Sequence, residues 1–125
     1  MTGSALERML VMTEVRKLYV SGPMSGKPNF NYDLFNEVSS ALRGMGYVVF
    51  NPAESFGGDQ TLSYDVYMRL DIAMILQSDA LVLLEGWQQS RGAKVEVAVA
   101  QAIGLRLFVL DTGCLVEHTE GEAER

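Results

Sequence analysis

Short, continuously apolar runs alternate along the chain with longer segments in which apolar residues recur every three or four positions. The short runs are rich in leucine, β-branched and aromatic residues, which is typical of buried strands. These predicted strands are residues 17–20, 47–50, 80–84 and 106–110. The longer segments have the periodicity of amphipathic helices. These predicted helices are residues 31–46, 63–78 and 93–104.

Strands separated by helices of this length predict right-handed βαβ units and a mainly parallel sheet. We therefore expect a three-layer, doubly wound α/β domain in which the four parallel strands have the order 2-1-3-4. In such sheets, ligands bind beyond the carboxyl ends of the strands, near the point where the strand order reverses. The loops that follow the four strands are the candidate binding segments.

One domain accounts for this pattern. We expect an extension over residues 1–16, the α/β domain over residues 17–111 and an acidic tail over residues 112–125, where residues 114–118 could add an edge strand as a fifth member of the sheet. The 125 residues, 48% of them hydrophobic, are enough for one hydrophobic core. The net charge of −6 argues against a nucleic acid polymer as partner, but a small anionic ligand could still bind.

Residue types that build metal and redox sites are scarce. Cys114 is the single cysteine and His118 the single histidine, so an internal disulfide is excluded. A histidine-based triad or a zinc site is disfavoured, because too few ligand residues are present. No apolar run approaches the ~18 residues of a membrane span. The first residues lack the pattern of a signal peptide. We expect a cytoplasmic protein with no metal, no cofactor and no membrane contact.

The loop after the first predicted strand, SGPMSGKPN, contains two glycines, two serines and Lys27 ahead of a helix. Backbone N–H groups in such a loop could hold an anion. The spacing of Gly22 and Gly26 does not match a Walker A motif or the dinucleotide fingerprint. A tight strand-to-helix turn explains the same residues, so both interpretations stay open.

Glu96 lies near the start of an otherwise apolar helix, just beyond the carboxyl end of the third predicted strand. A glutamate in the first turns of a helix is ordinarily explained by the helix dipole. Its place at the ligand-binding edge instead favours a nucleophile, which Arg91, Lys94 and the dipole would keep ionised.

Three further residues lie at or near this edge. Asp71 borders the apolar stripe of the second helix, although a solvated helix carboxylate is the commoner case. Tyr19 and Trp87 offer flat apolar surfaces, and core packing is their simpler role.

Three stretches together resemble the nucleoside 2-deoxyribosyltransferase superfamily: LYVSGPMSG, RLDIAMILQSDALVLLEGW and SRGAKVEVAVAQAIGLRLFVL. The chain looks closest to a compact bacterial and phage branch of mostly unassigned activity, and it is also similar to deoxynucleoside 5′-monophosphate N-glycosidases. The resemblance covers about residues 17–111. It implies a flavodoxin-like sandwich that cleaves or transfers at the N-glycosidic bond of a 2′-deoxynucleoside or deoxynucleoside 5′-monophosphate.

The resemblance also implies roles for individual residues. Glu96 would be the nucleophile, Asp71 would assist the leaving base or hold the sugar, and Tyr19 would orient Glu96. Ser90 matches the serine that contacts phosphate in the branch that hydrolyses 5′-monophosphates. The other implied substrate-binding residues are Ser21, Gly22, Pro23, Met24, Gly26, Lys27, Trp87 and Gly92.

The sequence also departs from the family. The first loop lacks the arginine of the nucleotide-hydrolysing branch, for which Lys27 would have to substitute, and polar residues that a neighbouring subunit often supplies have no match. Small domains of this superfamily usually associate, so we expect a homodimer or a larger even homo-oligomer with a nucleoside or nucleotide as ligand. Transfer and hydrolysis both stay open. The alternatives are an enzyme similar to NAD glycohydrolases and a non-catalytic nucleotide-binding module.

Overall fold

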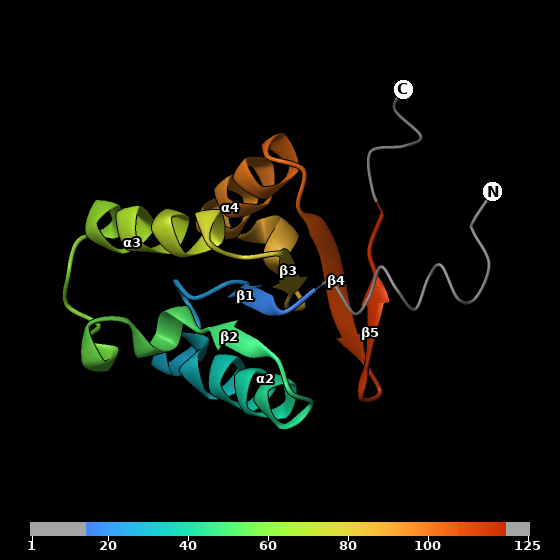
Figure 1. Cartoon of the computed structure of the whole chain (residues 1–125). Coiled ribbons are helices and arrows are strands. Elements are labelled where there is room, and N and C mark those ends of the chain that lie inside the picture. Colours follow the sequence, from blue (N-terminus) through green and yellow to red (C-terminus); the bar gives the residue numbers. More distant parts are fainter. Residues whose placement is uncertain (1–14, 120–125) are drawn as a thin grey trace, which may run out of the picture.

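A five-stranded sheet with the order β2-β1-β3-β4-β5 crosses the computed structural model, which describes residues 15–119 (Figure 1). Its strands are β1 (Lys17–Ser21), β2 (Val48–Phe50), β3 (Ala80–Leu83), β4 (Arg106–Asp111) and β5 (Cys114–Glu117). The first four strands are parallel, which confirms the predicted order 2-1-3-4. The segment after β4 turns back as the antiparallel edge strand β5, joined to β4 by the ion pair Arg106–Glu117 at 2.8 Å.

Helices cover both faces of the sheet, as the α/β three-layer prediction required. Figure 1 shows α2 (Tyr32–Gly44) on one face and α3 (Tyr64–Leu76) with α4 (Arg91–Ala102) on the other. The central strand β3 is buried along its whole length because both of its faces are covered.

Strand β1 shows how the sequence pattern divides the core. Leu18 and Val20 pack in the cluster that contains Phe35 of α2, whereas Tyr19 packs in the cluster that contains Ile75 and Val97 of α3 and α4. Successive side chains of a strand point to opposite faces, so one apolar run serves two cores. Burial of each large aliphatic side chain contributes about 1.5–3 kcal/mol.

The amino end of β1 is fixed by Asp79, which precedes β3. Its Oδ2 accepts hydrogen bonds from the backbone N–H groups of Arg16 and Lys17, both at 2.8 Å. This contact sets the two central strands side by side, and their carboxyl ends therefore meet at one edge of the sheet.

Residues 1–14, which make up most of the predicted extension, and residues 120–125 of the predicted tail lie outside the described part of the chain. Between residues 15 and 119, no helix is both long enough and apolar enough to cross a membrane. The homodimer or larger even oligomer stays a prediction.

Candidate active site

Glu96 is held beneath the carboxyl end of β1 by two hydroxyl groups. Tyr19 Oη donates to Oε2 at 2.8 Å and Ser21 Oγ donates to Oε1 at 2.7 Å. Both donors belong to β1. They reach the same carboxyl because residues two apart on a strand point to the same face. The helix that carries Glu96 begins at the N-cap Ser90, whose Oγ accepts from the N–H of Ala93 at 3.1 Å. Glu96 is only 5% exposed, so it is not a solvated residue of the first helical turns.

Asp71 of α3 is the second buried carboxyl group at this edge, and it is 7% exposed. Its Oδ1 has no hydrogen-bond partner among the residues of the described chain. A buried carboxylate oxygen without a hydrogen-bond partner destabilises the folded state, so stability alone does not explain an aspartate at this position. The commoner alternative for Asp71, a solvated helix carboxylate, is therefore excluded.

Burial raises the pKa of both carboxyl groups, and the charge of Asp71 adds to the shift of Glu96. Burial raises the pKa of Asp71 from 3.8 to about 6, although interactions with Glu96 and Tyr19 act in the opposite direction. Burial, followed by the charge of Asp71, raises the pKa of Glu96 well above its ordinary value, while Ser21 and Tyr19 oppose this shift. Burial first, then the charge of Glu96, raises the pKa of Tyr19 well above 10, so its hydroxyl remains a donor. Two adjacent buried carboxyls titrate as a pair and retain a proton to a higher pH than ordinary carboxyls.

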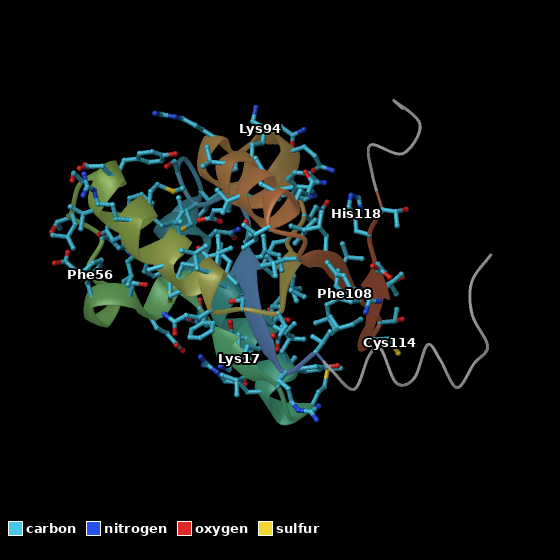
Figure 2. All side chains as sticks on the ribbon, turned by 45° about the horizontal axis from the view of Figure 1, so that its top comes forward. Lys17, Phe56, Lys94, Phe108, Cys114 and His118 are labelled. Atoms are coloured by element: carbon cyan, nitrogen blue, oxygen red, sulfur yellow. The ribbon has the colours of Figure 1, made fainter. Side chains whose placement is uncertain are left out.

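The expectation that Arg91 and Lys94 keep Glu96 ionised is wrong. The guanidinium of Arg91 stacks on the ring of Tyr64 at 4.5 Å, and Lys94 is exposed and points outward from α4 (Figure 2). Arg91 and Lys94 lie five and two residues before Glu96, which places them on the outer side of α4, whereas Glu96 faces the sheet. The ionised form of Glu96 therefore depends on the hydroxyls of Tyr19 and Ser21.

Both carboxyls face one cavity of about 230 Å³ between the carboxyl edge of the sheet and helices α2, α3 and α4. Its wall is mostly apolar and aromatic, with the carboxyl groups as its charged members. The lining residues are Gly22, Met24, Ser25, Phe30, Phe35, Pro52, Gln60, Leu62, Tyr64, Tyr67, Met68, Asp71, Ser90, Gly92, Ala93 and Glu96. An apolar cavity with a few convergent polar groups is typical of a small-molecule site.

The structure brings most of the predicted site residues together. Besides the two carboxyls, the predicted residues that line the cavity are Gly22, Met24, Ser90 and Gly92. Tyr19 and Ser21 are fully buried, with their hydroxyls on Glu96.

Besides Ser21, four predicted binding residues lie outside the cavity lining. Gly26 and Lys27 are exposed at the far end of the first loop, and Pro23 is buried against the Gly86 turn. Trp87 is 6% exposed and packs in the core between the sheet and α3 and α4, with its ring against His118 at 6.0 Å. Trp87 thus has the simpler role, because its large apolar surface is covered by the core.

Apart from Asp71, the wall that α3 contributes was not predicted from the sequence. Tyr64, Tyr67, Met68 and Asp71 recur at intervals of three and four residues and form one face of this helix toward the cavity. That spacing was visible in the sequence as an aromatic stripe that ends in a carboxylate. The loop residues Phe30, Gln60 and Leu62 had no such local signal, because distant segments bring them to the cavity.

Gly22 provides a test of how closely the first loop must approach β3. A Cβ at this position would lie 2.6 Å from Leu84 Cβ, a distance at which something must shift. We expect Gly22→Ala to lower the free energy of unfolding by about 1–3 kcal/mol, the usual cost of overpacking, as measured by urea denaturation.

Gly44 is the matched control for this substitution. It ends α2, and among the described residues no atom beyond its chain neighbours and the backbone of its own helix lies within 4 Å of the point that an added Cβ would occupy. Gly44→Ala should be neutral or stabilising by up to about 1 kcal/mol, because alanine favours the helix. Equal stability of the two variants would show that the Gly22 loop can move away from Leu84 without cost.

Among residues 15–119, no group of three or more His, Cys, Asp or Glu side chains lies together in a way that could hold a metal ion.

Comparison with known proteins gives a family and a fold. Residues 16–109 match the family described as "Domain of unknown function (DUF4406)". None of the curated proteins matches the chain. A solved 2-desoxiribosyltransferase from Leishmania mexicana is similar with a TM-score of 0.57 and 22% identity, over 78% of this chain and 66% of that one. The chain thus spans slightly less than two thirds of that protein.

A 2-deoxyribosyltransferase from Bacillus psychrosaccharolyticus is also similar, with a TM-score of 0.59 and 17% identity, over 74% of this chain and 70% of that one. At these identities the likeness concerns the fold. The flavodoxin-like, deoxyribosyltransferase-like fold that the sequence resemblance implied is confirmed.

Proposed function

The chain belongs to the DUF4406 family, whose function is unknown, and from that starting point we propose that it cleaves or transfers at the N-glycosidic bond of a 2′-deoxynucleoside or its 5′-monophosphate. One observation carries the proposal. A buried carboxyl held by two hydroxyl donors, Glu96, shares a cavity with a second buried carboxyl that has a free oxygen, Asp71. The similar folds of the two deoxyribosyltransferases support it.

In the first step, an ionised Oε of Glu96 forms a bond to C1′ of the sugar while the C1′–N bond breaks. The electrons of that bond leave on the base nitrogen, and protonated Asp71 gives its proton to the base. In the free protein the charge of Asp71 raises the pKa of Glu96, so the shared proton of the pair lies on Glu96. The step requires that this proton moves to Asp71 when substrate is bound, and the hydroxyls of Tyr19 and Ser21 favour that move because they stabilise charge on Glu96. A carboxylate can both stabilise the oxocarbenium-like centre and trap it as an ester.

In the second step, water or a second base attacks C1′ and the ester bond to Glu96 breaks. The electrons return to the Glu96 carboxylate, and the proton of the attacking group passes to Asp71. The same two residues therefore serve hydrolysis and transfer, and the acceptor that occupies the cavity decides between the two outcomes.

The charge of the cavity favours an unphosphorylated nucleoside over a nucleotide. Among the described residues that line it, two are acids and none is a lysine or arginine. Ser90, the implied phosphate contact, lines the cavity; its Oγ accepts from the N–H of Ala93, and its hydroxyl could donate at most one neutral hydrogen bond to a phosphate. Arg91, the next residue in the chain, is outside the lining and stacks on Tyr64. A phosphate dianion would lose its hydration there with little compensation.

Base release from a panel of substrates tests the proposal. We expect chromatography to show free base from 2′-deoxynucleosides, with slower or no release from the 5′-monophosphates, and added free base should yield an exchanged nucleoside if transfer occurs. Release of nicotinamide from NAD alone would instead identify an enzyme similar to NAD glycohydrolases. Binding without release from any substrate would identify a nucleotide-binding module and overturn the proposal.

A further inference from the structure

The turn that leads from the first loop into α2 has an unusual backbone. Asn29, Phe30 and Asn31 have φ angles of 52°, 51° and 62°, so three consecutive residues other than glycine are left-handed. L-amino acids disfavour this region because Cβ approaches the following carbonyl, and they normally visit it as single residues. A run of three requires surrounding contacts that hold it in place.

Those contacts are hydrogen bonds on both sides of the turn. Phe30 N–H donates to Lys27 O at 3.0 Å, and Asn31 Nδ2 donates to Pro23 O at 2.9 Å. Gln60 Nε2 donates to Asn29 Oδ1 at 2.9 Å, and this bond links the turn to a loop 31 residues later. The turn is thus fixed both to the first loop and to the loop after β2.

The result of this fixed geometry is the position of one aromatic side chain. Phe30 lines the cavity, yet it remains 38% exposed, unlike Phe35 of α2, which lines the same cavity and is 1% exposed. A phenyl ring that is left partly exposed at the rim of a cavity does not repay backbone strain by core burial. The ring lies tilted against Tyr32 at 6.3 Å between centroids, and its exposed part would be covered by a flat ligand in the cavity.

We propose that Phe30 is a binding residue that stacks on the planar base of the substrate, and that the left-handed turn serves to hold its ring over the cavity. This inference rests on the proposed function. The reacting C1′ must lie against Glu96 and Asp71, so the sugar occupies the end of the cavity that these two carboxyl groups line. The base then extends toward the rim, where Phe30 lies. Aromatic side chains stack on any base through its π-face.

Binding to a protein that cannot turn over isolates this role. In the Glu96→Gln background, a 2′-deoxynucleoside and free 2-deoxyribose are titrated and followed by ligand NMR. We expect Phe30→Ala to weaken nucleoside binding about tenfold, the usual value of one base–aromatic stack, and to leave binding of 2-deoxyribose unchanged. Phe30→Leu keeps an apolar side chain without a flat ring and should also weaken nucleoside binding, whereas Phe30→Trp should retain it.

Phe56 offers a matched control. Its backbone is also in the left-handed region, with φ 53°, and its side chain is 47% exposed. The ring packs edge-on against Tyr67 and is absent from the cavity lining. Figure 2 shows it at the outer end of the loop after β2. Phe56→Ala should leave nucleoside binding unchanged.

The outcomes separate this inference from the proposed function. Unchanged nucleoside binding in Phe30→Ala, or equal losses for nucleoside and sugar, would overturn the stacking role while the glycosidic activity stands. Failure of the parent protein to bind or cleave any nucleoside would overturn the proposed function and this inference together.

Discussion

Glu96→Gln should lower base release by about three orders of magnitude or more while the fold is kept. A neutral amide is a poor nucleophile and cannot balance positive charge at C1′, and loss of a covalent nucleophile is among the most damaging changes an enzyme can suffer. The amide has nearly the size of the carboxyl, and the hydroxyls of Tyr19 and Ser21 can each donate or accept, so the local hydrogen bonds can re-form. Single-turnover base release and thermal melts are the measurements.

Glu37→Gln is the control for the loss of one carboxylate. Glu37 is exposed on α2, across the sheet from α4, so this variant should retain full base release. A Glu96→Gln protein that melts normally and releases base at the parent rate would remove Glu96 from the mechanism.

Asp71→Asn should lower base release from natural nucleosides by about 10²–10⁴-fold, the usual range for loss of a general acid. The deficit should shrink for nucleosides whose base leaves without protonation, because Asp71 acts on the leaving group. The same activated substrates should not rescue Glu96→Gln, because the nucleophile is needed for every leaving group. Equal deficits on both kinds of substrate would assign Asp71 to holding the sugar instead.

The stability of Asp71→Asn provides a second readout of the same residue. The folded protein binds a proton at Asp71 with a pKa of about 6, against 3.8 for the ordinary group. The stability of the parent should therefore be fully present below about pH 4 and fall as pH rises toward 6, by about 3 kcal/mol for this difference in pKa. The Asp71→Asn variant should not show this fall in stability, because asparagine does not ionise.

Chemical denaturation at pH 4 and pH 7.5 measures the effect. The parent and Asp71→Asn should be similar at the lower pH, and the variant should be the more stable protein at the higher pH. An equal or larger stability of the parent at pH 7.5 would mean that the ionised carboxyl of Asp71 is stabilised in the fold, contrary to its burial and its unpartnered Oδ1.

These two carboxyls together explain why the site is costly to the fold. Glu96 and Asp71 are buried, repel one another and keep protons that an exposed acid would release. Apolar or amide side chains at these positions would pack with less penalty. Active sites commonly reduce stability in this way, and the cost is tolerated where the chemistry needs it.

The local patterns in the sequence were sufficient to predict the order and the parallel direction of the first four strands. Each strand is a short apolar run and each helix a periodic one, and the handedness of βαβ connections leaves few ways to order them. The edge strand β5 was foreseen only as an option, since residues 114–117 pair with β4 through a two-residue turn that has no strong hydrophobic pattern. The place of Glu96 also followed from the sequence, because the carboxyl ends of parallel strands converge on one edge.

Only the tertiary structure decided the state of the site. Asp71 is buried because α3 packs beside α4 and places its carboxyl next to Glu96 and Tyr19, and no local pattern encodes that packing. The pKa of Glu96 is raised because its neighbours in space are Asp71, Tyr19 and Ser21, whereas its neighbours in sequence, the cations preceding it on α4, point elsewhere. Secondary structure depends on interactions between residues close in the chain, but burial and protonation depend on which distant segments come together.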